Sequence, residues 1–272
     1  MFLLLQTALY SLAVSAVLYH VSPRFRYLFR YGFMYSFALC AGACCIPQGL
    51  LYRPCDLRNG GRFVRPLRCV SWALGIHWRV EGLEHLKGLR ERGAVIVSNH
   101  QSAVDVLGMV ELWPDVHRLA SVIKREVWLG FPFALAAWLC GQIFINRRDP
   151  EAAKKTLSQV ADRLDREKIK LWVFPEGTRG DGVNLLPFKK GAFHMAVSAG
   201  VPVLPVVFSS YRSFLDGREW KWTPGEATVR ILPAVDTAGM SSGDDIDQLT
   251  RRTQQLIADT FKQLSRQSTR DR

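Results

Sequence analysis

The sequence predicts an α/β fold, in which a mixed and mostly parallel sheet is flanked by helices. Apolar runs of strand length stand at 94–97, 170–174 and 203–208. Helical patterns separate them, as over residues 150–164, where apolar residues recur at spacings of three and four. Alternating strands and helices are typical of such sheets, whose ligands gather at the carboxyl ends of the strands.

The composition is that of a folded chain with anionic partners. The chain has 272 residues, 48% of them hydrophobic and 11% aromatic, which excludes general disorder and suffices for one sizeable domain with a small appendage. A formal net charge of +12 indicates nucleic acid, an acidic membrane surface or phosphorylated substrates as partners. We expect no nucleic acid, because the positive charges form neither one basic helix nor a known nucleic-acid module.

The amino-terminal segment has the pattern of a membrane anchor. Residues 2–19 are eighteen residues without a charge, just enough to span a bilayer, and three arginines follow between residues 24 and 30. A second, nearly uncharged segment at 31–52 argues against a cleaved signal peptide. We predict a two-helix membrane motif, a membrane-associated hairpin over residues 1–60, followed by a separate domain over residues 61–272.

A third uncharged stretch, residues 127–145, is long enough to be another membrane helix. Pro132 interrupts it near its start and Gly141 near its end. We therefore predict a short helix at 133–140 and a strand at 143–145.

Two polar residues follow the first apolar run. His100 and Asp105 come directly after the run at 94–97 and have four residues between them. A carboxylate that holds one imidazole nitrogen leaves the other free to take a proton, so the pair is a candidate general base with its orienting acid. The alternative is that His100 caps a helix and Asp105 is a surface acid.

A second polar cluster follows the run at 170–174. It contains Glu176, Gly177, Thr178 and Arg179. The glycine permits a tight turn, and the guanidinium suits a phosphate bidentately, so the cluster is a candidate anion site. The alternative is a turn closed by a salt bridge between Glu176 and Arg179.

The usual nucleophiles and metal ligands are missing from the sequence. No Gly-x-Ser-x-Gly motif occurs, so the activated hydroxyl is expected to belong to a substrate, which indicates a transferase. The six cysteines include no Cys-x-x-Cys pair. We expect no metal and no cofactor.

Four motifs in order resemble those of the glycerolipid acyltransferase family, most closely the 1-acylglycerol-3-phosphate (lysophosphatidic acid) acyltransferases. The His-x4-Asp motif corresponds to residues 100–105, and the Phe-Pro-Glu-Gly-Thr-Arg motif to residues 174–179. Residues 141–147 and 201–206 are similar to the second and fourth motifs. The similarity runs from about residue 95 to beyond residue 232.

The resemblance implies a glycerolipid acyltransferase fold and a reaction. An acyl chain would pass from acyl-CoA, a co-substrate, to the sn-2 hydroxyl of lysophosphatidic acid, giving phosphatidic acid and CoA. His100 would be the general base and Asp105 its partner. The residues implied in substrate binding are Glu176, Gly177, Thr178, Arg179, Arg147 and Lys124.

The expected location is the endoplasmic reticulum membrane, with the catalytic domain facing the cytosol, where acyl-CoA is found. Two alternatives stay open at this point. The chain could be a related acyltransferase that uses glycerol-3-phosphate or another lysophospholipid, or a non-catalytic membrane protein that binds lipid.

Overall fold

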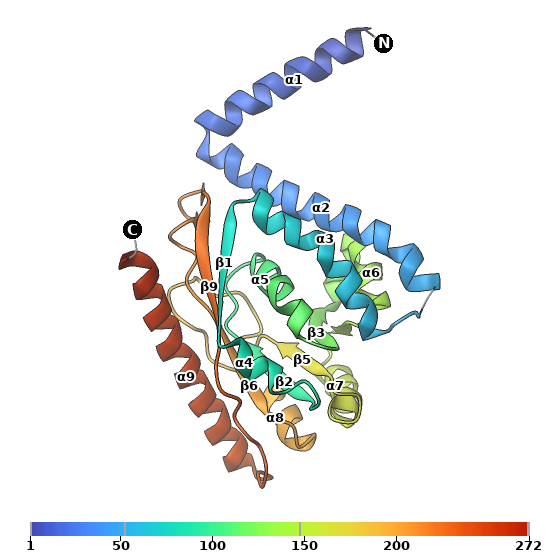
Figure 1. Cartoon of the computed structure of the whole chain (residues 1–272), viewed down its shortest axis with the longest axis vertical. Helices are drawn as coiled ribbons and strands as arrows, with labels where there is room; N and C mark the ends of the chain where they lie inside the picture. The colour runs from blue at the N-terminus through green and yellow to red at the C-terminus, as the bar shows by residue number, and fades with distance from the viewer. Residues whose placement is uncertain (1, 52, 147, 271–272) are drawn as a thin grey trace.

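The computed structural model describes residues 2–51, 53–146 and 148–270, and its centre is a seven-stranded sheet in the order β1-β9-β6-β2-β5-β3-β4 (Figure 1). The strands are β1 (Ile76–Glu81), β2 (Ala94–Ser98), β3 (Leu119–Lys124), β4 (Ile143–Ile145), β5 (Lys170–Val173), β6 (Val203–Phe208) and β9 (Gly225–Ile231). The β6–β9 pairing is antiparallel and the other pairings are parallel, so β1 and β9 run against the rest of the sheet. The predicted mixed, mostly parallel sheet is confirmed.

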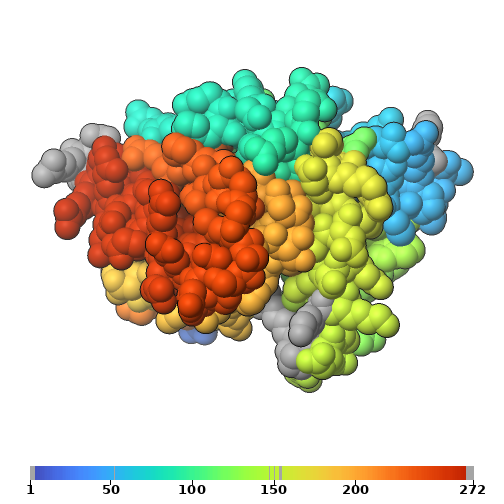
Figure 2. Space-filling view, turned by 90° about the horizontal axis from the view of Figure 1, so that it is seen from below, coloured from blue at the N-terminus to red at the C-terminus, as the bar shows by residue number. Residues whose placement is uncertain are grey.

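Helices cover both faces of this sheet. One face carries α3 (Gly60–Ala73), α4 (Leu83–Lys87) and α5 (Asp105–Leu112), and the other carries α7 (Pro150–Leu164), α8 (Gly191–Ser198) and α9 (Gly243–Arg270). Within β2, Ile96 packs in the first of these cores, whereas Val95 and Val97 pack in the second. Figure 2 shows α4 in cyan on one side and α7, α8 and α9 in yellow, orange and red on the other. Two short 3-10 helices, η1 (Leu57–Asn59) and η2 (Trp113–Asp115), flank α3 and α5.

The amino-terminal helices α1 (Phe2–Val21) and α2 (Pro23–Leu51) meet at an elbow at residue 22 and then diverge, with α1 extending away from the domain (Figure 1). Both helices are long and apolar enough to cross a membrane, and the apolar window of α1 is 0% buried. The arginine-rich segment at 24–30, which separates the two uncharged stretches, forms the first turns of α2. The Arg30 guanidinium donates hydrogen bonds to the Leu74 carbonyl oxygen and to the Tyr19 hydroxyl, and these contacts stabilise the helix in this segment.

One face of α2 packs on the domain. Met34 and Ala41 are buried, and a Cβ on Gly42 would lie 2.8 Å from the Cα of Phe133 in α6 (Phe133–Leu139). Because Gly42 has no side chain, α2 approaches α6 closely at this position. The division of the chain at residue 60 stays a prediction.

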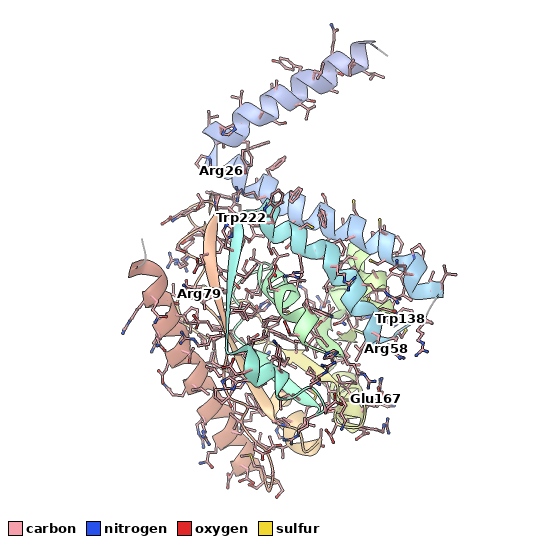
Figure 3. The ribbon with its side chains drawn as sticks, in the orientation of Figure 1. Arg26, Arg58, Arg79, Trp138, Glu167 and Trp222 are labelled. Carbon is pink, nitrogen blue, oxygen red and sulfur yellow. The ribbon has the colours of Figure 1, made fainter. Side chains whose placement is uncertain are left out.

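The uncharged stretch at 127–145 is not one helix. It is divided among η3 (Arg125–Gly130), α6 and β4, as predicted from Pro132 and Gly141. η3 presents Leu129 to solvent at 92% exposure, and Phe131 and Trp138 are also exposed. In Figure 3, Trp138 lies at the rim of the domain beyond α3.

A small hairpin that the sequence did not predict follows β6. It consists of β7 (Leu215–Asp216) and β8 (Lys221–Trp222). Trp222 is fully buried against Tyr27 and Tyr31 of α2, with ring centroids 6.2 and 4.5 Å away. Figure 3 shows Trp222 beneath the elbow, near Arg26. The hairpin thus fixes α2 to the sheet.

Candidate active site

His100 and Asp105 form a hydrogen-bonded pair at the carboxyl end of β2. His100 lies in the loop that leaves the strand, and Asp105 is the first residue of α5. The His100 Nδ1 to Asp105 Oδ2 distance is 2.7 Å, and Oδ2 also accepts the backbone N–H groups of Gln101 and Ser102 at 2.8 and 3.0 Å. The Asp105 side chain is 0% exposed, so the alternative that it is a surface acid is wrong.

The ring of His100 is held against a second aromatic ring. Its plane stacks on Phe174, with centroids 4.0 Å apart, and 19% of the side chain is exposed. Because Nδ1 is held by a carboxylate, Nε2 is the nitrogen that can take a proton from a bound group. Nε2 has no hydrogen-bond partner in the described parts of the chain. Such an arrangement can serve as a general base with an orienting acid.

Two contacts with β6 hold this loop in place. The Asn99 side chain donates to the Phe208 carbonyl oxygen at 3.0 Å and accepts the Phe208 N–H at 2.9 Å. Gly108, one turn into α5, lets the helix approach the sheet, since a Cβ there would lie 2.5 Å from the Phe208 ring and 2.9 Å from Trp78. The close approach of α5 brings Asp105 to His100.

The loop after β5 is bonded to the His100 loop. Glu176 accepts the His100 N–H through Oε1 and the Leu186 N–H through Oε2, both at 2.7 Å, and the Gly180 N–H donates to the His100 carbonyl oxygen at 2.7 Å. Glu176 is only 4% exposed, and this burial raises the pKa of its carboxyl group while the two N–H donors oppose the rise. Both oxygens serve backbone donors, so the alternative salt bridge from Glu176 to Arg179 is wrong.

Cations surround the turn at residues 174–180. Gly177 has φ +73°, and a Cβ there would lie 2.8 Å from the Lys189 ammonium, which covers the turn. Thr178 and Arg179 are exposed beside it. The structure thus places a cation that the sequence reasoning missed, Lys189, next to the predicted anion site. In the sequence, Lys189 is marked by its position in the Phe-Lys-Lys-Gly segment that follows the third motif.

One of the other two predicted cations, Lys124, lies at the same edge of the sheet. Lys124 ends β3 and is exposed. Arg147, which follows β4, lies outside the described residues. Since β2, β5, β3 and β4 are parallel neighbours, their carboxyl ends form one row, with His100 at β2 and the cations on the β5 and β3 side of it.

Helix α2 forms a wall of the site. A pocket of about 270 Å³ lies beside His100, and its lining includes Tyr27 and Tyr31 of α2 together with Gln101, Ser102 and Gly180. The Tyr31 hydroxyl is 3.4 Å from the Ser102 Oγ. The sequence reasoning did not connect α2 with the site, because no local pattern reveals this long-range contact.

Tyr211 lies behind the pair. It is 2% exposed, and its pKa is raised well above the usual value, first by burial and then by the neighbouring Asp105 carboxylate. The Tyr211 hydroxyl and Asp105 Oδ1 are both buried, and neither forms a hydrogen bond among the described residues. A donor and an acceptor therefore face each other in the interior. As to metals, no three His, Cys, Asp or Glu side chains come together as ligands within the described ranges.

Comparisons with known proteins agree with this geometry. A model of the Acyltransferase family matches residues 77–209. The human 1-acyl-sn-glycerol-3-phosphate acyltransferase alpha is 36% identical over 255 residues, which cover 91% of this chain and 86% of that protein. The human beta enzyme is 36% identical over 236 residues, covering 84% of this chain and 83% of that protein.

The fold also has a solved counterpart. The crystal structure of the 1-acyl-sn-glycerophosphate (LPA) acyltransferase PlsC from Thermotoga maritima superposes with a TM-score of 0.66 at 22% identity, covering 88% of this chain and 95% of that one. That likeness shows the fold. Identity of this extent with the human enzymes, over most of both chains, shows in addition that this chain is an enzyme of the 1-acyl-sn-glycerol-3-phosphate acyltransferase family.

Proposed function

We propose that this enzyme transfers an acyl chain from acyl-CoA to the sn-2 hydroxyl of 1-acyl-sn-glycerol-3-phosphate, giving phosphatidic acid and CoA. The observation that carries the proposal is the 2.7 Å contact between His100 and Asp105, in a loop bonded directly to the turn that bears Arg179. The reaction needs no cofactor. Its place is the endoplasmic reticulum membrane, with the catalytic domain on the cytosolic side, where acyl-CoA is available.

In this mechanism His100 Nε2 takes the proton of the acceptor hydroxyl, and Asp105 stabilises the imidazolium that forms. The alkoxide oxygen attacks the thioester carbonyl, and the tetrahedral intermediate then expels the CoA thiolate, which receives the proton back from His100. No acyl-enzyme forms. Holding both substrates in reach contributes about 7–11 kcal/mol of barrier reduction, against about 3–5 kcal/mol for the base, so positioning is the larger effect.

A groove on the β3 and β4 side supports an amphiphilic acceptor. It has a volume of about 630 Å³, and its lining combines apolar Trp128 and Leu129 with the cations Arg125 and Arg148. The acid Glu126 also lines it and lies 3.9 Å from the Arg148 guanidinium. Lys124 directly precedes it along the chain. An apolar surface beside cations suits a lipid that carries a phosphate. The apolar helix α1 would hold the enzyme at the membrane from which this lipid arrives.

The test is an acceptor panel. Membranes that contain the wild-type chain or the His100→Ala variant are incubated with oleoyl-CoA and with lysophosphatidic acid, glycerol-3-phosphate or lysophosphatidylcholine, and the products are identified by mass spectrometry. We expect phosphatidic acid from the wild type and none above background from the variant. If another acceptor were acylated in preference to lysophosphatidic acid, that acceptor would be assigned as the substrate instead. Lipid binding without any acyl transfer would identify a non-catalytic protein.

A further inference from the structure

A second hollow lies on the opposite side of His100 from Lys124. Strand β6 neighbours β2 on that side, and the segment that follows β6, the β7–β8 hairpin and the carboxyl-terminal half of α9 enclose a pocket of about 610 Å³. The pocket shares Gly182, Arg212 and Asp216 with the smaller pocket beside His100. The two hollows are therefore neighbours that meet at these three residues.

Cations outnumber acids in the lining of this pocket, whose acids are Asp216 and Glu219. Arg212 is paired with Asp216, with Nε 2.8 Å from Oδ2. Lys221, Lys262 and Arg266 also line it, and none of them forms an ion pair within the part of the chain that the structure describes.

Two of these cations lie near the carboxyl end of α9. Lys262 and Arg266 stand four residues apart on α9, where like charges destabilise a helix. Both side chains are exposed, whereas the neighbouring Phe261 packs in the core. Exposed cations without an ion pair are suited to a ligand that carries phosphates.

We propose that this pocket binds the adenosine bisphosphate end of acyl-CoA. This inference rests on the proposed function. The predicted cations for the acceptor phosphate lie on the β5 and β3 side of His100, so the phosphates of the donor approach from the β6 side. The pantetheine arm then runs through the small pocket and brings the thioester to His100. The volume lies within the range of about 300–1,000 Å³ that is usual for small-molecule sites.

The test compares CoA with 4′-phosphopantetheine, which lacks the adenosine bisphosphate. Binding to the full chain in detergent is measured by calorimetry for the wild type, for Lys262→Gln/Arg266→Gln, and for Arg252→Gln as an exposed control on the same helix. The wild type and the control are expected to bind CoA at least about tenfold more tightly than 4′-phosphopantetheine, and the double variant is expected to lose this preference.

Kinetics separate this inference from the proposed function. The double variant should raise the KM for oleoyl-CoA about tenfold. The KM for oleoyl-pantetheine and that for lysophosphatidic acid should stay unchanged. If the wild type did not transfer an acyl chain from either donor, the proposed function would be wrong. The calorimetry would still show whether this pocket binds CoA. Unchanged CoA binding in the double variant overturns the inference. If that variant binds CoA normally but no longer binds vesicles of anionic phospholipid, the cations contact the membrane and the inference is also overturned.

Discussion

The Glu176 carboxylate accepts the backbone N–H of His100 at 2.7 Å, although the two residues follow different strands. Its other oxygen accepts the N–H of Leu186. One buried acid thus fixes the loop that carries the base to the loops that carry Arg179 and Lys189. The third motif therefore positions the proposed base as well as the predicted anion site.

Glu176→Gln should lower both stability and turnover. An amide offers one acceptor oxygen, so its NH2 group would face one of the two backbone N–H donors, and an unsatisfied buried group costs about 1–3 kcal/mol. We expect a lower melting temperature in detergent together with a lower kcat. Glu91→Gln, on an exposed side chain, serves as the control. A variant with wild-type melting and kcat would show that the carboxylate does not position His100.

His100 and Arg179 should affect different kinetic constants. His100→Ala is expected to reduce kcat by at least about 10²–10⁴-fold with little change in the KM for lysophosphatidic acid, because it removes the base and leaves the phosphate contacts. Arg179→Gln is expected to act mainly by raising that KM. Initial rates over a range of lysophosphatidic acid concentrations give both constants.

The exposed Arg166, beyond α7 near the opposite end of the sheet, provides the control Arg166→Gln, which should match the wild type. If His100→Ala retained substantial kcat, the base assignment would be wrong. If Arg179→Gln left the KM unchanged, the phosphate would be bound elsewhere.

The sequence revealed those parts of the fold and the site that have local patterns. Strands β2 and β5 are buried on both faces, so they read as continuous apolar runs. β9, with Glu226 and Arg230 alternating with buried residues, and β1 have mixed patterns and were not predicted. The His100 and Asp105 pair is likewise local, because its members stand on the two ends of one short loop.

Residues brought in by tertiary folding had no such signal. Tyr31 and Tyr211 reach the site from α2 and from the segment after β6, and neither position is distinguished by its neighbours in the chain. Lys189 lies over Gly177 because its N–H bonds the Pro175 carbonyl oxygen, a contact made only in the folded loop. Helix α2 also includes a charged segment, since Arg30 finds its partner at Leu74.

Tyr211→Phe should change the pH dependence of catalysis. The hydroxyl faces the Oδ1 atom of Asp105, and without this donor the carboxylate would hold the protonated His100 ring more firmly. The acid limb of the kcat/KM profile is therefore expected to move to higher pH. Initial rates from pH 5 to pH 9 would show the shift, with exposed Tyr35→Phe as the control. A lower rate with an unmoved profile would assign Tyr211 a purely structural role.

Lys170 provides a test of stability at the far end of the sheet. It is the first residue of β5 and 1% exposed, and its ammonium donates to the carbonyl oxygens of Arg90 and Lys168 at 2.8 and 3.1 Å. Burial lowers its pKa from 10.5 to about 8. Between these values the unfolded chain keeps a proton that the native state has lost, so this residue makes the free energy of unfolding rise with pH.

Comparison with Lys170→Met isolates this contribution. The difference in the free energy of unfolding, wild type minus variant, should be constant below about pH 8 and increase from there to pH 10.5. Urea titrations in detergent at several pH values would measure it, and exposed Lys155→Met should show no such trend. A difference independent of pH throughout would mean that Lys170 is as readily protonated in the native state as in the unfolded chain. Turnover at neutral pH should be spared, because Lys170 lies at the opposite end of β5 from Glu176.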